Sequence, residues 1–398
     1  MKLICNTCSS VPGTGPVDGP NEWLCTRCGE ALTQSLPDVG SWADAVTDTP
    51  GVGRYAALLP VSEPDNLRSN EKALVPVESP RLAESLGVAS VRLLPQTWND
   101  TGTFKDNEGV LIAAKCLEWG LSSVSMHSSG NTARSYQYYT DRLGITCTAF
   151  VPQASAYKCP TTSMGKSRVV AVPGNMADAA EAAIAFSKEH GALRLTPSQW
   201  KIEGKVPLGL AIAERCADAT IVAVTIASGY GPLGIERGIR RAGEAGLPTV
   251  GEHTYHLFQA ADAGVLGEAL RDGRDEIDLG DMVPPEQAFE PTLQSTNPNR
   301  TLPLVRQLVA ETGARVDPVE PSQVEAEAQL LLDACAELDI PLAYETEKSA
   351  FICWGGLRQA AQAWPGTRRP DRHGGQRIDA ARPAALVTTV TTERARLE

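Results

Sequence analysis

The chain has 398 residues, a formal net charge of −12, and 42% hydrophobic but only 5% aromatic residues. This length is too great for one simple core and suits two α/β lobes. The acidic balance argues against a nucleic-acid partner, because recognition of a phosphate backbone depends on an excess of Lys and Arg. No apolar run approaches the roughly 18 residues that span a bilayer, and the first residues lack a signal-peptide core. We therefore expect a cytoplasmic protein with no membrane partner.

The first 48 residues contain two Cys-x2-Cys pairs that are separated by sixteen residues. Cysteine thiolates at this spacing are typical of a closed, tetrahedral Zn²⁺ site. A redox pair is less well supported, because neither pair opens a helix after a strand. The sequence therefore predicts an N-terminal zinc ribbon and linker over residues 1–48, with structural zinc bound by Cys5, Cys8, Cys25 and Cys28.

From about residue 50, stretches with strand-like and helix-like apolar spacing alternate along the chain. In the first half, we expect strands at 72–77, 88–95, 122–129, 145–152 and 167–174, and helices at 79–87, 106–120, 131–144 and 176–191. In the second half, we expect a strand, turn and helix at 219–246, a strand at 248–254, a helix at 324–339, a strand and helix at 340–364, a loop at 364–383 and a last strand at 384–393. Repeated β-turn-α units imply parallel sheets with helices on both faces. The fold class expected for residues 49–398 is α/β, with two interleaved lobes of parallel-type sheets flanked by helices.

The segment "TGTFKDNEG" places Lys105 in a small-residue turn before an apolar helix. A lysine that is held in a turn and partly removed from water loses its proton more readily, so it can act as a nucleophile or form a Schiff base. Most lysines are solvated surface charges, so this segment is informative only in combination with others.

Two further segments lie between a predicted strand and a predicted helix. In "SSGNTA", residues 128–133, Gly130 permits a tight turn, and short hydroxyls with free N–H groups can bind an anion, although an ordinary N-cap has the same composition. In "SGYGPLG", residues 228–234, three glycines let backbone amides approach a phosphate, and the missing Gly-Lys-Ser/Thr ending argues against ATP or GTP. A reactive lysine, an acid-binding turn and a phosphate cup together suit pyridoxal 5'-phosphate (PLP) and an amino-acid substrate.

These segments resemble a known family. "TGTFKD", "SSGNTA", "SGYGPLG" and the N-terminal cysteine pairs look like a threonine synthase-like enzyme of the fold-type-II (tryptophan synthase β) group. The resemblance runs from about residue 50 to the end, and includes "RYAALLPV", "IEGKVPLGLAIAERC" and "STNPNRTLPLV". It implies PLP as cofactor, an amino-acid substrate and a homodimer.

The resemblance also implies a role for each matching residue. Lys105 would bind the cofactor aldehyde and then act as acid and base, and Phe104 would pack against the cofactor. Asn131 would hydrogen-bond the ring hydroxyl, and the substrate carboxylate would be held by Ser128, Ser129 and Thr132. The phosphate cup would consist of Gly229, Tyr230, Gly231, Leu233 and Gly234. Thr388 or Thr389 would face the pyridine nitrogen, and a hydroxyl there suits β- or γ-elimination and replacement better than transamination.

Several positions depart from the family pattern. The Arg that usually follows Lys-Asp is replaced by Asn107 and Glu108, the Thr-Pro before the first core strand is absent, and "TTVTTERA" replaces a C-terminal Gly-His-Gly run. "SSGNTAR" is also similar to the cysteate synthases. Arg54, Lys158 and Arg134 are candidates for binding an anionic leaving group, although ordinary surface pairs would explain them too.

We therefore expect a PLP-dependent lyase or synthase of the threonine synthase-like type. It would catalyse β- or γ-elimination or replacement on an O-phospho or O-acyl amino acid, in a specialised pathway rather than as a housekeeping threonine synthase. The alternatives are a cysteate synthase-like β-replacement on phosphoserine and a PLP-binding scaffold without turnover.

Overall fold

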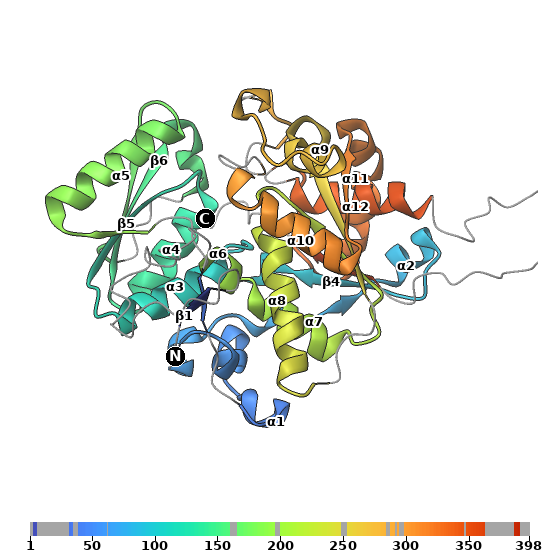
Figure 1. The fold of residues 1–398 in the computed structure, drawn as a ribbon, viewed down its shortest axis with the longest axis horizontal. Coiled ribbons are helices and arrows are strands. Elements are labelled where there is room, and N and C mark those ends of the chain that lie inside the picture. Colours follow the sequence, from blue (N-terminus) through green and yellow to red (C-terminus); the bar gives the residue numbers. More distant parts are fainter. Residues whose placement is uncertain are drawn as a thin grey trace, which may run out of the picture.

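The computed structural model describes residues 3–5, 32–34, 39–61, 63–159, 165–195, 200–247, 253–283, 287–290, 293, 298–345, 348–362 and 386–390 (Figure 1). For residues 3–5, 32–34 and 386–390 the description is of the backbone. The strands are β1 Leu3–Cys5, β2 Leu32–Gln34, β3 Val77–Glu78, β4 Val91–Pro95, β5 Ser123–His127, β6 Thr146–Pro152, β7 Arg168–Val172, β8 Leu193–Arg194, β9 Ile221–Thr225, β10 Thr254–Ala260, β11 Arg315–Val319 and β12 Leu386–Val390. The helices are α1 Trp42–Ala45, α2 Pro80–Leu86, α3 Asp106–Glu118, α4 Asn131–Arg142, α5 Met176–His190, α6 Trp200–Glu203, α7 Val206–Arg215, α8 Tyr230–Glu244, α9 Val265–Arg271, α10 Leu302–Thr312, α11 Pro321–Glu337 and α12 Ser349–Ala361.

The larger lobe is built on a six-stranded sheet with the order β11-β10-β9-β12-β4-β3. Its neighbouring strands are parallel, except that the short edge strand β3 is antiparallel to β4. The last strand of the chain, β12, lies between β9 and β4, with Thr388 beside Ala223 on one side and Leu93 on the other. The end of the chain therefore completes the middle of this sheet.

The smaller lobe is built on a four-stranded parallel sheet with the order β7-β6-β5-β8. Helices α4 and α5 pack against it, and Figure 1 shows this lobe beside the larger one. Helix α3 packs against both α4 and α6, so it links the smaller lobe to the segment that leads into α7. The N-terminal strands β1 and β2 form a separate antiparallel pair.

The larger sheet is buried on both faces, as β9 shows. Val222 and Val224 belong to a core cluster that includes residues of α7 and α8, whereas Ile221 and Ala223 pack with residues of α11 and α12. Because successive side chains of a strand point to opposite faces, an apolar run of this kind is expected where helices cover both sides of a parallel sheet.

These findings confirm the predicted α/β fold class, with parallel sheets flanked by helices. Strands or helices form in most of the segments where they were expected, including β9, the turn and α8 within residues 219–246. The strand predicted at 248–254 lies mostly outside the described residues, and β10 begins at its last residue, Thr254. The loop predicted at 364–383 also lies outside them. Among the helices of the described chain, none is long and apolar enough to cross a membrane.

Two strand predictions were wrong. Residues Glu71–Leu74 form a 3-10 turn, because the Asn70 side chain caps it and the Gln96 amide donates to the Ala73 carbonyl at 2.8 Å. Only Val77–Glu78 of that region pairs as a strand. Residues 340–345 are not a strand either, since Tyr344 turns back onto Phe351 of α12, with ring centroids 4.9 Å apart.

Candidate active site

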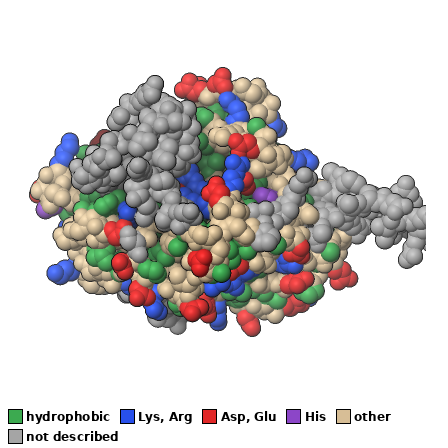
Figure 2. Space-filling view, turned by 60° about the horizontal axis from the view of Figure 1, so that its bottom comes forward, with side chains coloured by type: hydrophobic (Ala, Val, Ile, Leu, Met, Phe, Trp, Pro, Cys, Tyr) green, Lys and Arg blue, Asp and Glu red, His purple; other side chains and the backbone are tan. Residues whose placement is uncertain are grey.

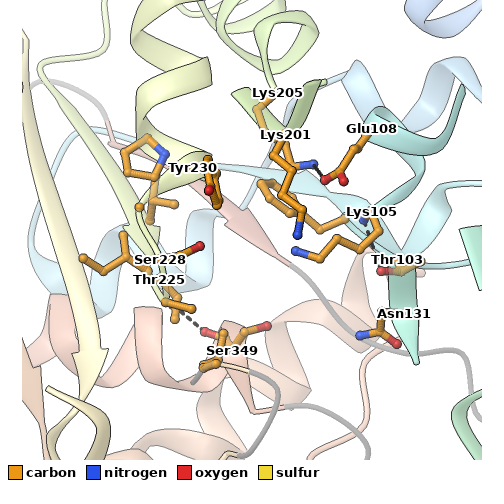
Figure 3. Close-up of a pocket in the computed structure, with 18 residues that line it drawn as sticks. Thr103, Lys105, Glu108, Asn131, Lys201, Lys205, Thr225, Ser228, Tyr230 and Ser349 are labelled. Atoms are coloured by element: carbon orange, nitrogen blue, oxygen red, sulfur yellow. Dashed lines mark hydrogen bonds and ion pairs between the residues drawn. The ribbon is translucent and has the colours of Figure 1, made fainter. Parts of the chain in front are cut away.

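A cavity of about 110 Å³ lies where the carboxyl end of β9 meets the N-terminal ends of α3, α4, α8 and α12. In parallel α/β sheets, ligands characteristically bind outside the carboxyl ends of the strands. Figure 3 shows its labelled polar side chains converging on one space from both lobes. The lining residues are Thr103, Phe104, Lys105, Glu108, Asn131, Lys201, Lys205, residues 224–232, Leu293 and Ser349.

Lys105 lies at the N-cap of α3, half-buried, and its side chain points into the cavity (Figure 3). Its backbone N–H donates to the Thr103 hydroxyl at 3.2 Å. The next residue fixes the turn, because the Asp106 carboxylate accepts hydrogen bonds from both the backbone N–H and the hydroxyl of Thr101. Burial raises the pKa of Asp106 to about 6 in spite of these bonds. The turn thus holds the lysine amine at the wall of the cavity.

The N-terminal end of α8 forms the opposite wall. Gly229 has φ +83°, a conformation that glycine adopts without the strain of a side chain, and a Cβ there would collide with Val305. A Cβ on Gly231 would stand 3.5 Å from the Phe104 ring. The helix is 15 residues long, and its first N–H groups have no partner within the helix, so this end favours a phosphate.

The predicted cup residues divide into two groups. Gly229, Tyr230 and Gly231 line the cavity. Leu233 instead packs against the hydrophobic core, and Gly234 lies so close to the Ile202 carbonyl that no side chain fits there. Gly234 therefore serves helix packing rather than the cavity wall.

The predicted carboxylate turn is also divided. Asn131 lines the cavity, but Ser128, Ser129 and Thr132 do not. The Ser128 hydroxyl accepts a hydrogen bond from the Gly130 N–H at 3.1 Å, which stabilises the turn. Gly130 has φ +133°, and a Cβ there would meet the Lys158 side chain at 2.6 Å.

Sequence reasoning missed two cavity lysines, Lys201 and Lys205. Lys205 Nζ donates to Glu108 Oε2 at 3.2 Å, and the exposed fractions of the two side chains are 2% and 1%. The Tyr136 hydroxyl donates to the other carboxylate oxygen of Glu108. The spacing of Lys201 and Lys205, four residues apart as on one helix face, was the available signal.

The charges in this cluster shift each other's pKa values. Burial lowers the pKa of Lys205 to about 8, although Glu108 opposes the shift. Burial would raise the pKa of Glu108, but the charges of Lys205, Lys201 and Lys105 outweigh it and hold the pKa at about 2. Burial and the neighbouring Lys105 also lower the pKa of Lys201, against the effect of Glu108. Glu108 is therefore the ionised partner of the lysine cluster, which accounts for its departure from the family pattern.

Close backbone contacts bring the lysine segment to the cavity. A Cβ on Gly204 would stand 2.5 Å from the Cα of Glu108, so α3 and this segment touch through their backbones. Glu203 is fully buried and accepts hydrogen bonds from Arg241 at 2.6 and 2.8 Å and from Arg237 at 2.6 Å. These two arginines belong to α8, so the segment is tied to the helix that carries the phosphate cup.

Other candidates lie away from the cavity or outside the described side chains. Arg54 pairs with Glu214, and neither Arg54, Lys158 nor Arg134 lines the cavity. Thr388 and Thr389 lie in the backbone of β12, and their side chains are not described. Of the predicted zinc ligands, Cys5 ends β1, while Cys8, Cys25 and Cys28 lie outside the described residues. The described part of the chain contains no group of three or more potential metal ligands.

Comparison with known proteins assigns the chain to a family. The family model described as pyridoxal-phosphate dependent enzyme matches residues 73–318, which is more than half of the chain. The chain belongs to this family. The expected resemblance to fold-type-II PLP enzymes is thereby confirmed.

The curated relatives of this family member are threonine synthases. That of Methanosarcina acetivorans is 30% identical over 201 residues, 48% of this chain and 49% of the relative. That of Halalkalibacterium halodurans is 24% identical over 283 residues, 70% of this chain and 75% of the relative. The alignments with the first relatives span about half of those proteins' length.

Solved structures of the family share the fold. A threonine deaminase from the source abbreviated T.th. has a TM-score of 0.63 at 16% identity, with 82% of this chain and 94% of that chain covered. Maize serine racemase has a TM-score of 0.60 at 18% identity, with 81% and 90% covered. At these identities the comparison concerns the fold alone.

The cavity fits PLP on its own chemistry. It offers an amine from Lys105, an aromatic ring from Phe104, and an amide side chain from Asn131. Across from these, a glycine-containing helix start leaves backbone N–H groups open to a phosphate. An aldehyde, a ring and a phosphate therefore each have a complementary group.

Proposed function

We propose that the protein catalyses β- or γ-elimination or replacement on an amino acid whose side chain carries an O-phospho or O-acyl leaving group. The observation that carries this proposal is the position of the Lys105 amine and the α8 phosphate cup on opposite walls of one cavity. The identity to threonine synthases supports the reaction class, since threonine deaminase and the racemases are related through the fold alone.

Each residue then has a distinct task. When bound, PLP supplies an aldehyde that links to amines and a ring that draws electron density away from Cα. Lys105 holds the aldehyde and, once released from it, takes a proton from the substrate and returns one. Asn131 binds beside the ring, and residues 229–231 hold the phosphate. Ser128, Ser129 and Thr132 are proposed to hold the substrate carboxylate, and Thr388 or Thr389 the pyridine nitrogen.

The half-buried position of Lys105 suits proton transfer. Its amine lies in a cavity that also contains Phe104 and only a single lining carboxylate, Glu108, among the described residues. Since Glu108 is already bound by Lys205 and Tyr136, it leaves the Lys105 amine available to a ligand. A scaffold without turnover would not need this arrangement, so we favour an enzyme.

The test is phosphate release by the purified protein with PLP, using O-phosphohomoserine and O-phosphoserine in turn. The proposal predicts release that is abolished in Lys105→Ala and retained in Lys166→Ala, a variant of an exposed lysine on the smaller lobe. Added sulfite distinguishes β-replacement of the cysteate synthase kind, because the product then contains sulfur. Full turnover by Lys105→Ala would contradict the proposal.

We also propose that residues 1–48 form a zinc ribbon with Cys5, Cys8, Cys25 and Cys28 as ligands, preceding a catalytic region over residues 49–398, and that the protein is a homodimer. The antiparallel pairing of β1 with β2 supports a ribbon. Metal analysis after gel filtration tests both, because it gives the zinc content and the mass of the particle. Absence of zinc in protein purified without chelator would contradict the first, and a monomer the second.

A further inference from the structure

The cavity holds more cationic than anionic side chains. Its lining contains Lys105, Lys201 and Lys205, against the single carboxylate of Glu108. Both oxygens of that carboxylate accept hydrogen bonds, one from Lys205 and one from Tyr136. Two lysines therefore share this cavity wall without an acidic partner of their own among its lining residues.

Lys201 is the more distinctive of these two, because Lys105 is assigned to the aldehyde. Among the described residues, no carboxylate lies within ion-pair distance of Lys201 Nζ, and its recorded neighbour is the ring of Tyr230, 5.7 Å away at the ring centroid. Figure 3 shows its side chain reaching into the space that Lys105 also enters. An ammonium group that is half-buried without a counter-ion is unfavourable unless a ligand brings one.

Further cations surround this position. Arg300, at the exposed end of a short 3-10 turn, acts on both Lys201 and Tyr230. Burial lowers the pKa of His127, and the charges of Arg194 and Lys201 add to the effect. On the face shown in Figure 2, Lys and Arg side chains lie in and beside a central hollow. The local field therefore favours an anion although the whole chain carries a charge of −12.

We propose that Lys201, with Lys205 behind it, forms a side-chain subsite for a phosphate dianion next to the backbone cup of α8. The subsite rests on the proposed function for its ligands, which are phosphate monoesters. The group bound can come from the cofactor or from the side chain of the substrate. In the first case Lys201 strengthens cofactor binding, and in the second it selects phosphorylated over neutral amino acids.

The structure also explains why Lys205 stays in place behind Lys201. Glu108 and Tyr136 fix it at the back of the cavity, and its Nζ lies 4.7 Å from the centroid of the Phe104 ring. A phosphate at Lys201 would thus meet one mobile lysine in front and one fixed lysine behind. Charge-assisted hydrogen bonds of this kind favour phosphate over neutral groups.

The experiment compares the wild type with Lys201→Gln, Lys201→Arg and Lys166→Gln, the last removing an exposed lysine of equal charge. One arm titrates the cofactor-free full chain with PLP and with pyridoxal, which lacks the phosphate. The other titrates the PLP-loaded protein with O-phosphoserine and with serine, followed by the visible absorption of the cofactor. A third titration uses inorganic phosphate alone and measures heat.

The proposal predicts that Lys201→Gln weakens one phosphorylated ligand about 10- to 100-fold and leaves its unphosphorylated counterpart unchanged. The arm in which this occurs identifies the source of the phosphate. Lys201→Arg should retain most of the affinity, and Lys166→Gln should match the wild type. The ligand-free Lys201→Gln protein should be at least as stable as the wild type, because an unpaired cation has been removed.

Two results would overturn the subsite. One is equal affinity of the wild type and Lys201→Gln for PLP, O-phosphoserine and inorganic phosphate. The other is an equal loss in Lys166→Gln, which would indicate a general charge effect. Failure of the proposed function is distinguishable, because the wild type would then bind inorganic phosphate or PLP through Lys201 without responding to any phosphorylated amino acid.

Discussion

Replacing Glu108 by Gln should strongly destabilise the protein, because it leaves the ammonium of Lys205 without its charge partner. The exposed fractions of the two side chains are 2% and 1%, and Nζ and Oε2 lie 3.2 Å apart. Removing one partner of a pair buried to this degree costs about 3–5 kcal/mol of unfolding free energy. Replacing both partners by uncharged groups is often nearly neutral, so Glu108→Gln combined with Lys205→Met should recover most of the loss.

The assay is urea denaturation of the two single variants and the double variant, followed by circular dichroism. Asp65→Asn is the matched control, because it breaks the exposed Arg68–Asp65 pair, whose side chains are 54% and 78% exposed. That change should cost less than about 1 kcal/mol. If the double variant is as unstable as the sum of the single variants, the two residues act independently and the reasoning is wrong.

Three further changes test other parts of the structure. Gly204→Ala should cost about 1–3 kcal/mol of unfolding free energy, because its Cβ would stand 2.5 Å from the Cα of Glu108, whereas Gly355→Ala, with its nearest contact at 3.4 Å, should be tolerated; equal denaturation midpoints for the two variants would contradict this. Affinity for inorganic phosphate should fall as pH rises through about 8, because Lys205, which faces Glu108, Lys105 and Lys201, has a lowered pKa and loses its proton there, while the ligand stays dianionic; calorimetry that finds no change between pH 7 and 9 would refute this. Cys25→Ser should release zinc and lower the melting temperature while leaving the cofactor spectrum unchanged, and an inactive variant of full stability would count against a structural metal.

The sequence could predict the parts of the site that depend on local geometry. Lys105 precedes an apolar helix, and Gly229 with Gly231 stands between a strand and a helix, so neighbours along the chain reveal both. The same holds for β9 and α8, whose apolar spacing is strong. These elements lie where the periodicity places them.

The lysine cluster could not be predicted in this way. Glu108 and Lys205 are 97 positions apart, and their pairing depends on how α3 packs against the segment before α7. In the sequence, Glu108 appears only as a departure from the family pattern. The place of β12 between β9 and β4 has the same origin, because strand order depends on packing rather than on local spacing.

The strand errors also have a physical cause. Apolar residues in 72–77 suggested a strand, but side chains of Asn70 and Gln96 bind the backbone there and hold a 3-10 turn. Local spacing cannot report a competing partner that comes from a distant part of the chain.

The central claim is that Lys105 holds PLP and that the cavity accepts an activated amino acid. The most direct test is the visible absorption of the purified protein, alone and with O-phosphohomoserine, O-phosphoserine and the acetylated serine and homoserine in turn. We predict a Schiff-base band in the wild type that is missing in Lys105→Ala, and that one of these substrates shifts. A wild-type protein without such a band, even after PLP is added, would contradict the account.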